Sequence, residues 1–227
     1  MRNYRKKLFV FVWVFALLFS VVWEIASRMG EMADIADEDV LREAPKIALT
    51  FDDGPHAVYT EELLNGLKER GVVATFFLLG CNIEGKEELV RRMQEEGHLI
   101  GNHTYSHVQL TKLDETAACD EIWKTNMKIF DITGHIPEYI RPPFGSWNEK
   151  MACGIDMTAV LWDIDPLDWK SKNTDKVTSY ICNNASEGDI ILLHDVYKTS
   201  VEAALKVVDY FLSEGYEFVT VEELILD

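Results

Sequence analysis

The sequence predicts an α/β fold in which about seven parallel strands alternate with helices, and two observations carry this prediction. From residue 46 onward, short apolar runs of strand length alternate with longer stretches whose apolar residues recur at helical spacing. In addition, polar residues of the kinds found in active sites directly follow several of the apolar runs. The alternation alone allows an open doubly wound sheet or a closed barrel. The polar residues favour a barrel, because the carboxyl ends of its strands converge on one mouth.

Each expected strand is a short run of mainly apolar, β-branched or aromatic residues. In chain order the runs are KIALTF, ATFFLL, HLIGN, EYIR, TAVLW, DIILL and EFVT. These runs predict strands at residues 46–51, 74–79, 98–102, 138–141, 158–162, 189–193 and 217–220.

The stretches between these runs have apolar residues three and four positions apart, with charged residues between them. This spacing predicts helices at residues 60–70, 85–96, 114–133, 174–185 and 201–214. Helices that connect parallel strands lie outside the sheet, so the strands are expected at the centre of the domain.

The first 28 residues have the pattern of a membrane anchor. An uncharged run, residues 8–23, follows a basic segment. Basic residues stay on the cytoplasmic side, so the pattern predicts a single-pass protein of the cell membrane whose folded domain is extracytoplasmic. The alternative is a cleaved signal, which would leave a secreted protein. Residues 29–44 are expected to form an acidic stalk, and residues 45–227 one folded domain.

The charge of the chain limits its partners. The formal net charge is −17, and residues 1–30, with five basic and one acidic side chain, contribute +4 to it. The remainder therefore carries about −21, which disfavours nucleic acid and strongly anionic polymers as partners. A neutral substrate is easier to accommodate.

The four cysteines are far apart and form no CxxC pair, so a structural zinc knuckle is not expected. Outside the membrane they can form up to two disulfides, with three possible full pairings, or remain thiols. They are Cys81, Cys119, Cys153 and Cys182.

Two histidines and two aspartates predict a metal site. His103 and His107 are four positions apart, so one helical turn would place both imidazoles on the same face. Adding Asp53 or Asp52 gives two histidines and one carboxylate, with positions left open for water and substrate. Such a trio suits a zinc-type hydrolase or a non-haem iron oxygenase. The spare aspartate favours hydrolysis, which needs a separate base.

Five segments in order resemble the motifs of the polysaccharide deacetylase family, also called the NodB-homology domain or carbohydrate esterase family 4. The segments are TFDDGP (50–55), HTYSH (103–107), RPPF (141–144), DPLDW (165–169) and LLH (192–194). The resemblance covers about residues 45–227. It implies a distorted (β/α) barrel, similar to a TIM barrel but with fewer than eight strands.

The resemblance implies that Asp53, His103 and His107 bind a divalent metal, usually zinc and in some members cobalt or nickel. Asp52 would then be the base that activates the attacking water. His194 is a plausible general acid from its position at the end of an apolar run, and the resemblance gives it the role of protonating the departing amine.

Five further residues receive roles from the resemblance. Arg141 would pair with Asp52 and keep it ionised, and Asp168 would orient the ring of His194. The backbone N–H of Phe144, where the family often has tyrosine, would stabilise the oxyanion. Substrate binding would also involve two walls of the acetyl pocket, Trp169 and Leu192.

Five polar residues fit no such role. We expect His56, His98 and His135 to be structural or surface residues. We expect Asp163 and Asp195 to support the catalytic residues from behind or to be solvated, and not to be catalytic themselves.

The function expected from these features is a membrane-anchored, metal-dependent deacetylase that removes N-acetyl groups from an extracellular glycan. Peptidoglycan N-acetylglucosamine comes first as substrate because it lies within reach of an anchored enzyme. Chitooligosaccharides, another surface polysaccharide and acetylated xylan are alternatives. Some relatives that act on muramic acid carry asparagine at the position of Asp53, which argues against that sugar. A non-catalytic glycan-binding protein of the same fold is the remaining alternative.

Overall fold

The computed structural model describes residues 23–29, 43–148, 153 and 157–226, and the chain divides into two compact units, residues 1–43 and 44–227. In the first unit, residues 23–29 form a short exposed helix with an ion pair between Glu24 and Arg28. Most of the predicted anchor and stalk lie outside the described residues. None of the described helices is both long and apolar enough to cross a membrane.

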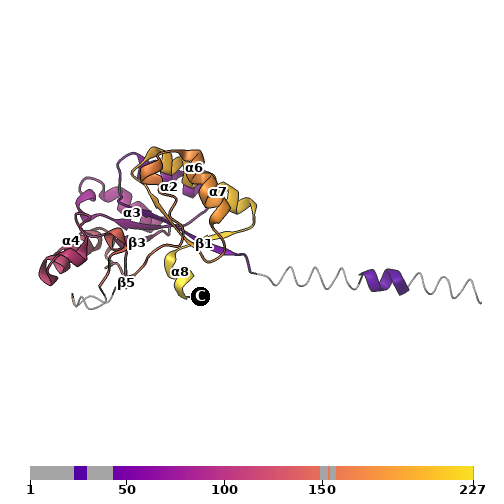
Figure 1. Cartoon of the computed structure of the whole chain (residues 1–227), viewed down its shortest axis with the longest axis horizontal. Coiled ribbons are helices and arrows are strands. Elements are labelled where there is room, and N and C mark those ends of the chain that lie inside the picture. Colours follow the sequence, from indigo (N-terminus) through magenta and orange to yellow (C-terminus); the bar gives the residue numbers. More distant parts are fainter. Residues whose placement is uncertain (1–22, 30–42, 149–152, 154–156, 227) are drawn as a thin grey trace, which may run out of the picture. The chain divides into compact units, whose positions relative to one another are not determined.

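A seven-stranded parallel sheet forms the centre of the second unit, as the sequence predicts (Figure 1). The strand order is β5-β4-β3-β2-β1-β6, and β7 also pairs with β1. The strands are β1 (Lys46–Asp52), β2 (Thr75–Leu78), β3 (Leu99–Asn102), β4 (Tyr139–Ile140), β5 (Thr158–Ala159), β6 (Ile190–His194) and β7 (Glu217–Val219).

The sheet curls into a barrel that is closed irregularly. β5 is only two residues long, shorter than the predicted strand at 158–162. Beyond it, Ile164 forms a single parallel bridge with Ile191 of β6. The amide of Leu192 donates to the carbonyl of Ile164 at 2.9 Å. One segment therefore begins beside β4 and ends beside β6, which gives the distorted (β/α) barrel expected for the fold class.

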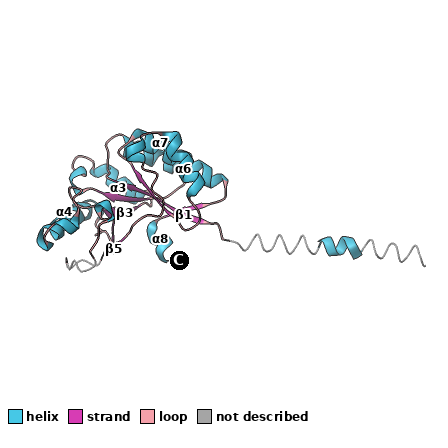
Figure 2. Ribbon diagram, in the orientation of Figure 1, coloured by secondary structure: helices cyan, strands magenta, loops and turns pink. Residues whose placement is uncertain are grey.

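The longer helices cover the outer face of the sheet (Figure 2). The described α-helices of the second unit are α2 (Tyr59–Arg70), α3 (Glu87–Glu95), α4 (Glu115–Thr133), α5 (Asp168–Ser171), α6 (Thr174–Asn184), α7 (Lys198–Ser213) and α8 (Val221–Leu226). Of the two short ones, α5 carries the pocket residue Trp169, and α8 packs against the inner-face residues Ala48 and Phe77. The five longer ones match the predicted helices to within a few residues, whereas α5 and α8 are too short to show a helical period.

Alternate side chains of β1 face the apolar core and the functional pocket. Ile47, Leu49 and Phe51 belong to the main apolar core, together with side chains of α2 and α7. Successive strand residues face opposite sides. Thr50 and Asp52 therefore face the barrel interior, where they reach the side chain of Arg141.

One disulfide is present among the described cysteines. It joins Cys119 of α4 to Cys153, with 5.2 Å between their Cα atoms. Cys81 and Cys182 are free thiols. The structure thus selects one of the pairings that the sequence left open, and it fixes α4 to the chain segment between β4 and β5.

Candidate functional site

The carboxyl ends of the strands surround one pocket of about 370 Å³. Eight of the predicted site residues line it: Asp52, Asp53, His103, His107, Phe144, Trp169, Leu192 and His194. The other two, Arg141 and Asp168, are fully buried and contact residues of this lining. Residues as distant in the sequence as Asp52 and His194 therefore meet where parallel strands end, as expected for a barrel mouth.

Three side chains could hold a metal ion. One ligand atom each from Asp53, His103 and His107 lies within 4.8 Å of the others. Oδ1 of Asp53 lies 3.6 Å from Nε2 of His103 and 3.5 Å from Nε2 of His107. This oxygen is buried and has no hydrogen-bond partner among the described residues. A carboxylate oxygen that is buried, unpartnered and next to two imidazole nitrogens fits a divalent cation.

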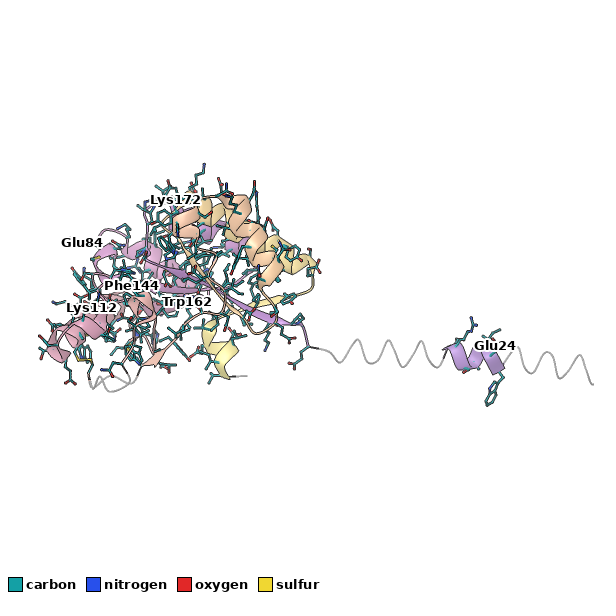
Figure 3. The ribbon with its side chains drawn as sticks, in the orientation of Figure 1. Glu24, Glu84, Lys112, Phe144, Trp162 and Lys172 are labelled. Atoms are coloured by element: carbon teal, nitrogen blue, oxygen red, sulfur yellow. A yellow bond between two sulfur atoms is a disulfide. The ribbon has the colours of Figure 1, made fainter. Side chains whose placement is uncertain are left out.

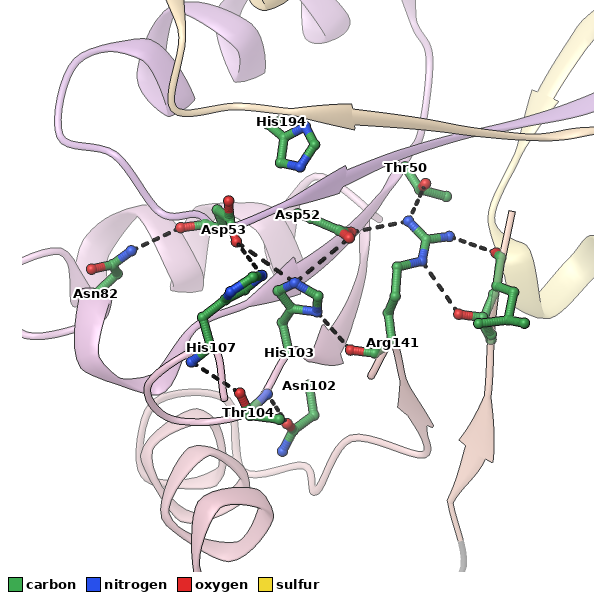
Figure 4. Close-up of polar contacts among 12 residues, drawn as sticks. Thr50, Asp52, Asp53, Asn82, Asn102, His103, Thr104, His107, Arg141 and His194 are labelled. Carbon is green, nitrogen blue, oxygen red and sulfur yellow. Dashed lines mark hydrogen bonds and ion pairs between the residues drawn. The ribbon is translucent and has the colours of Figure 1, made fainter. Parts of the chain in front are cut away.

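The buried imidazole of His103 is oriented by the backbone (Figure 4). Its Nδ1 lies 2.6 Å from the carbonyl oxygen of Arg141, so Nδ1–H is the donor. Nε2, without a proton, then faces Asp53. Burial lowers the pKa of His103, although the charges of Asp52 and Asp53 act in the opposite direction. The ring is therefore held neutral, as a metal ligand must be.

The expected helical turn between His103 and His107 is wrong. The segment is a loop in which Thr104 and His107 adopt φ values of 69° and 58°. Oδ1 of Asn102 accepts a hydrogen bond from the amide of Thr104 at 2.7 Å, and the Thr104 hydroxyl accepts one from the amide of His107 at 3.1 Å. These local bonds stabilise left-handed residues in place of a helix. The two rings still come together, with centroids 5.0 Å apart.

A buried arginine pairs with the second aspartate. Nη1 of Arg141 donates to Oδ1 of Asp52 at 3.0 Å and to the hydroxyl of Thr50 at 2.5 Å. The guanidinium lies over the ring of Phe77, 4.3 Å from its centroid. Burial lowers the pKa of Arg141, while Asp52 raises it. The pair leaves Oδ2 of Asp52 on the pocket side, 3.7 Å from Nε2 of His103.

The backbone bends immediately after β1, which brings both aspartates to one pocket. Asp53 has φ 70°, and the peptide bond between Gly54 and Pro55 is cis. The carbonyl of Asp53 accepts a hydrogen bond from the side chain of Asn82 at 2.8 Å. In a straight strand the two neighbouring side chains would face opposite sides.

His194, at the end of β6, faces Asp52 and Asp53 (Figure 4). It is paired with the carboxylate of Asp168. It lies opposite Asp52 in the register of β1 and β6. Its Nδ1 is 2.8 Å from Oδ1 of Asp168, and its amide donates to Oδ2 at 2.9 Å. Burial alone would lower the pKa of His194, but the Asp168 hydrogen bond and the nearby carboxylates raise it to about 9. The ring is therefore protonated near neutral pH.

Aromatic side chains line the pocket, and two of them, Phe144 and Trp162, are labelled in Figure 3. Phe144 is 65% exposed, has φ 62°, and lies edge-to-face against His107 with centroids 4.9 Å apart. Trp169 is also exposed, and Leu192 forms a buried wall. A half-open apolar rim beside polar groups is typical of a small-molecule or sugar site.

Four lining residues were given no role by the sequence patterns: Pro142, Trp162, Asp165 and Tyr197. Pro142 and Asp165 lie inside quoted motifs, and Tyr197 follows His194 by three positions, so nearness to the motifs was the available signal. Trp162 sits within a predicted strand and gave no such signal; its ring faces the Arg141 guanidinium at 5.8 Å.

The residues expected to have no direct role are mostly structural. Asp163 accepts a hydrogen bond from the amide of Ile190, and His56 accepts from amides at the start of α2. His98 is buried and His135 is exposed. Asp195, by contrast, is completely buried, so a solvated role is excluded.

Comparison with known proteins places this arrangement in a family. A family model described as polysaccharide deacetylase matches residues 40–158. A peptidoglycan-N-acetylglucosamine deacetylase of Listeria monocytogenes, PgdA, is 41% identical over 179 residues, which are 79% of this chain and 38% of that protein. A peptidoglycan-N-acetylglucosamine deacetylase of Bacillus cereus is 39% identical over 186 residues, covering 79% of this chain and 68% of that protein.

A third relative also has a solved structure. The peptidoglycan-N-acetylmuramic acid deacetylase PdaC of Bacillus subtilis is 40% identical over 178 residues, which are 78% of this chain and 38% of that protein. Its structure has a TM-score of 0.78 at 39% identity and covers 81% of this chain and 91% of that chain. The aligned part of this chain thus spans 38% of the length of PgdA and of PdaC. Since the family model matches more than half of the sequence, the chain belongs to the polysaccharide deacetylase family.

Proposed function

We propose that this protein is a metal-dependent hydrolase that removes N-acetyl groups from a glycan. The observation that carries the proposal is that one pocket holds a paired carboxylate and a paired imidazole beside three possible metal ligands. Asp52 is paired with Arg141, and the protonated His194 is paired with Asp168. A base and an acid beside one metal site suit hydrolysis of an amide, which needs a proton removed from water and a proton given to the amine.

The residues of the chain divide the reaction between them. Asp53, His103 and His107 would hold a divalent cation, zinc in this proposal with cobalt or nickel as alternatives. When bound, the cation would polarise the acetamide carbonyl and lower the pKa of the attacking water. Asp52 accepts the proton of the attacking water. His194 then donates a proton to the amine nitrogen as the carbon–nitrogen bond breaks.

Other residues position these groups and the substrate. Asp168 fixes the ring of His194 through Nδ1, which directs Nε2 toward the pocket. The backbone N–H of Phe144 would donate to the oxyanion, a role that needs no tyrosine hydroxyl. Trp169 and Leu192 would enclose the acetyl methyl group.

We propose peptidoglycan N-acetylglucosamine as the substrate, because PgdA and the Bacillus cereus relative are named for that sugar. The second candidate is N-acetylmuramic acid, since PdaC is named for it and is 40% identical. Asp53 favours the first sugar, because family members that act on muramic acid can carry asparagine there. The acidic composition of the chain, formally −17, also disfavours the additional carboxylate of muramic acid.

We further propose that residues 1–28 anchor the chain in the cell membrane and that the deacetylase domain acts outside it. The uncharged run of residues 8–23 behind a basic segment supports this placement. The alternative of a secreted, cleaved form differs in the mass of the mature chain, so mass spectrometry of protein from the membrane and medium fractions distinguishes the two.

Acetate release tests the proposed activity. The full chain, supplied with zinc or cobalt, is incubated with peptidoglycan, chitooligosaccharides and acetylated xylan, beside Asp52→Ala and the distant control Asp189→Ala. Release that the control retains and Asp52→Ala loses by about 100-fold or more would support the hydrolase. Glycan binding without release, in folded and metal-loaded protein, would instead show a binding protein. Product analysis by mass spectrometry identifies which sugar has lost its acetyl group.

A further inference from the structure

Asp195 is a fully buried carboxylate that no step of the proposed reaction uses. It directly follows His194 at the end of β6. Its side chain packs against the backbone of Gly54, where an added β-carbon would lie 2.5 Å from each carboxylate oxygen. Only glycine allows so close an approach at position 54.

Asp195 also holds the turn through a chain of hydrogen bonds. Its Oδ2 accepts a short hydrogen bond from the hydroxyl of Thr60, in the first turn of α2. The same hydroxyl accepts a hydrogen bond from the amide of His56 at 2.7 Å. The Gly54 carbonyl in turn accepts from the amide of Leu79 at 3.0 Å. Residues 54–56 are therefore fixed from β6, from α2 and from the end of β2.

The position of this carboxylate is costly for the fold. Its second oxygen, Oδ1, is buried without a hydrogen-bond partner among the described residues. A buried carboxyl group with an unpartnered oxygen lowers the stability of a protein relative to a well-packed neutral side chain. Stability therefore does not account for this residue, whereas the geometry of the neighbouring turn does.

We propose that Asp195 is a positioning residue that fixes the turn after Asp53 and thereby the directions of the Asp52 and Asp53 carboxylates. His194 and Asp195 are consecutive residues at the end of β6. His194 is the proposed acid, and Asp195 positions the proposed base, Asp52, and the proposed metal ligand, Asp53. The proposal rests on the metal-site and base roles given under the proposed function, and it assigns Asp195 no contact with substrate.

Zinc affinity and steady-state kinetics of full-chain variants test this role. In Asp195→Ala and Thr60→Val, which break the same hydrogen bond from opposite ends, we expect zinc affinity to fall by about 10- to 100-fold, the range found for residues that orient metal ligands. We expect kcat at saturating zinc to fall with little change in KM. Asp195→Asn keeps an oxygen acceptor for Thr60 in the same volume, so its zinc affinity should stay within about threefold of the wild type.

The double variant and a control separate positioning from general damage. The effects of Asp195→Ala and Thr60→Val should be less than additive, because both remove one interaction. Asp189→Ala is the matched control, since it removes a carboxylate that accepts a backbone hydrogen bond at the other end of β6. It should leave zinc affinity unchanged.

Two results would overturn the proposal. One is wild-type zinc affinity and kcat in folded Asp195→Ala. The other is an equal loss in Asp195→Asn and Asp195→Ala, which would show that charge matters and the hydrogen bond does not. The zinc measurements need no glycan, so they decide this proposal even if the chain releases no acetate from any substrate.

Discussion

His103, which is buried, and His194, which is half-buried, line the same pocket yet differ in protonation. His103 places Nδ1 on a backbone carbonyl, and burial lowers its pKa. His194 places Nδ1 on the carboxylate of Asp168, and its pKa rises to about 9. A carbonyl fixes the tautomer without supplying a negative charge, whereas a carboxylate also stabilises the imidazolium.

The comparison shows that the partner of Nδ1 determines what Nε2 can do. With a carbonyl as partner, Nε2 is an unprotonated nitrogen that can bind a metal. With a carboxylate as partner, Nε2 carries a proton that it can donate. One pocket can therefore hold two histidines, one as a metal ligand and one as an acid. Substitutions at either histidine or at its partner test this division of roles.

The largest expected effects come from removing each histidine, because one substitution should abolish metal binding and the other should abolish proton transfer. His103→Ala should lose zinc affinity by about 100-fold or more, because it removes a direct ligand. His194→Ala should keep zinc affinity within about threefold while kcat falls by about 10²- to 10⁴-fold. Calorimetric zinc titration and acetate release measure the two quantities. A loss of zinc affinity in His194→Ala comparable to that in His103→Ala would contradict the separate roles.

A smaller effect should follow from replacing Asp168, the partner of His194, with the uncharged residue asparagine. In Asp168→Asn we expect the pKa of His194 to fall from about 9 toward its ordinary value, and kcat at pH 7 to fall by about tenfold or more. Since the acid must be protonated, activity is lost as pH rises through the pKa of His194. The alkaline limb of the kcat profile should therefore move to lower pH in the variant.

The bound cation affects where this limb lies. The charges of Asp52 and Asp53 contribute to the raised pKa of His194, and a cation beside them opposes that contribution. The wild-type limb is thus expected at or below about pH 9. An alkaline limb at the same pH in the wild type and in Asp168→Asn would show that Asp168 does not set the protonation of His194.

The raised pKa of His194 predicts how the stability of the fold depends on pH. His194 binds its proton more tightly in the folded than in the unfolded chain, so its protonation stabilises the fold, and this stabilisation is fully present below about pH 6.5. It is lost as pH rises from there to about 9. Chemical unfolding of metal-free protein across this range should show the loss in the wild type and a smaller loss in Asp168→Asn.

The smallest expected effect concerns His98, a third histidine, which lies outside the pocket and has a backbone amide as the partner of Nδ1. Nδ1 of His98 accepts a hydrogen bond from the amide of Ala74, and burial lowers its pKa to about 4. The folded state therefore binds fewer protons than the unfolded state below pH 6.5, and stability falls as pH is lowered. Between pH 7 and pH 5 we expect about 1–2 kcal/mol of this loss in the wild type.

His98→Gln should remove that part of the pH dependence, because glutamine does not titrate. The measurement is the free energy of unfolding in urea at both pH values for the wild type and the variant. Identical pH dependence in the two proteins would show that His98 is not held neutral.

Much of the fold could be predicted because it follows from local patterns. The seven apolar runs correspond to the seven strands, and the motif residues do lie at strand ends, since parallel strands bring their carboxyl ends together. The spacing of His103 and His107 was less informative. A separation of four suits a helix, but the hydrogen bonds of Asn102 and Thr104 produce a loop, and no periodicity reveals such bonds.

Other features depend on contacts between distant segments and could not be predicted. Four cysteines allow several pairings, and only the packing of α4 against the segment after β4 brings Cys119 and Cys153 together. Trp162 carries no motif signal, yet it lines the pocket. The contact between Asp195 and Gly54 depends on how the ends of β1 and β6 pack together. The sequence of either strand alone does not reveal this packing.

The central place of β1 implies that the two walls of the pocket differ in local unfolding. β1 is bonded to β2, β6 and β7 and ends at Asp52, so its amides should exchange with deuterium slowly. The opposite wall follows β4 and β5, two strands of only two residues each, and carries Phe144. Few ladder bonds hold that wall, so it should open at lower free energy and could adapt to different sugars while the reacting groups stay in place.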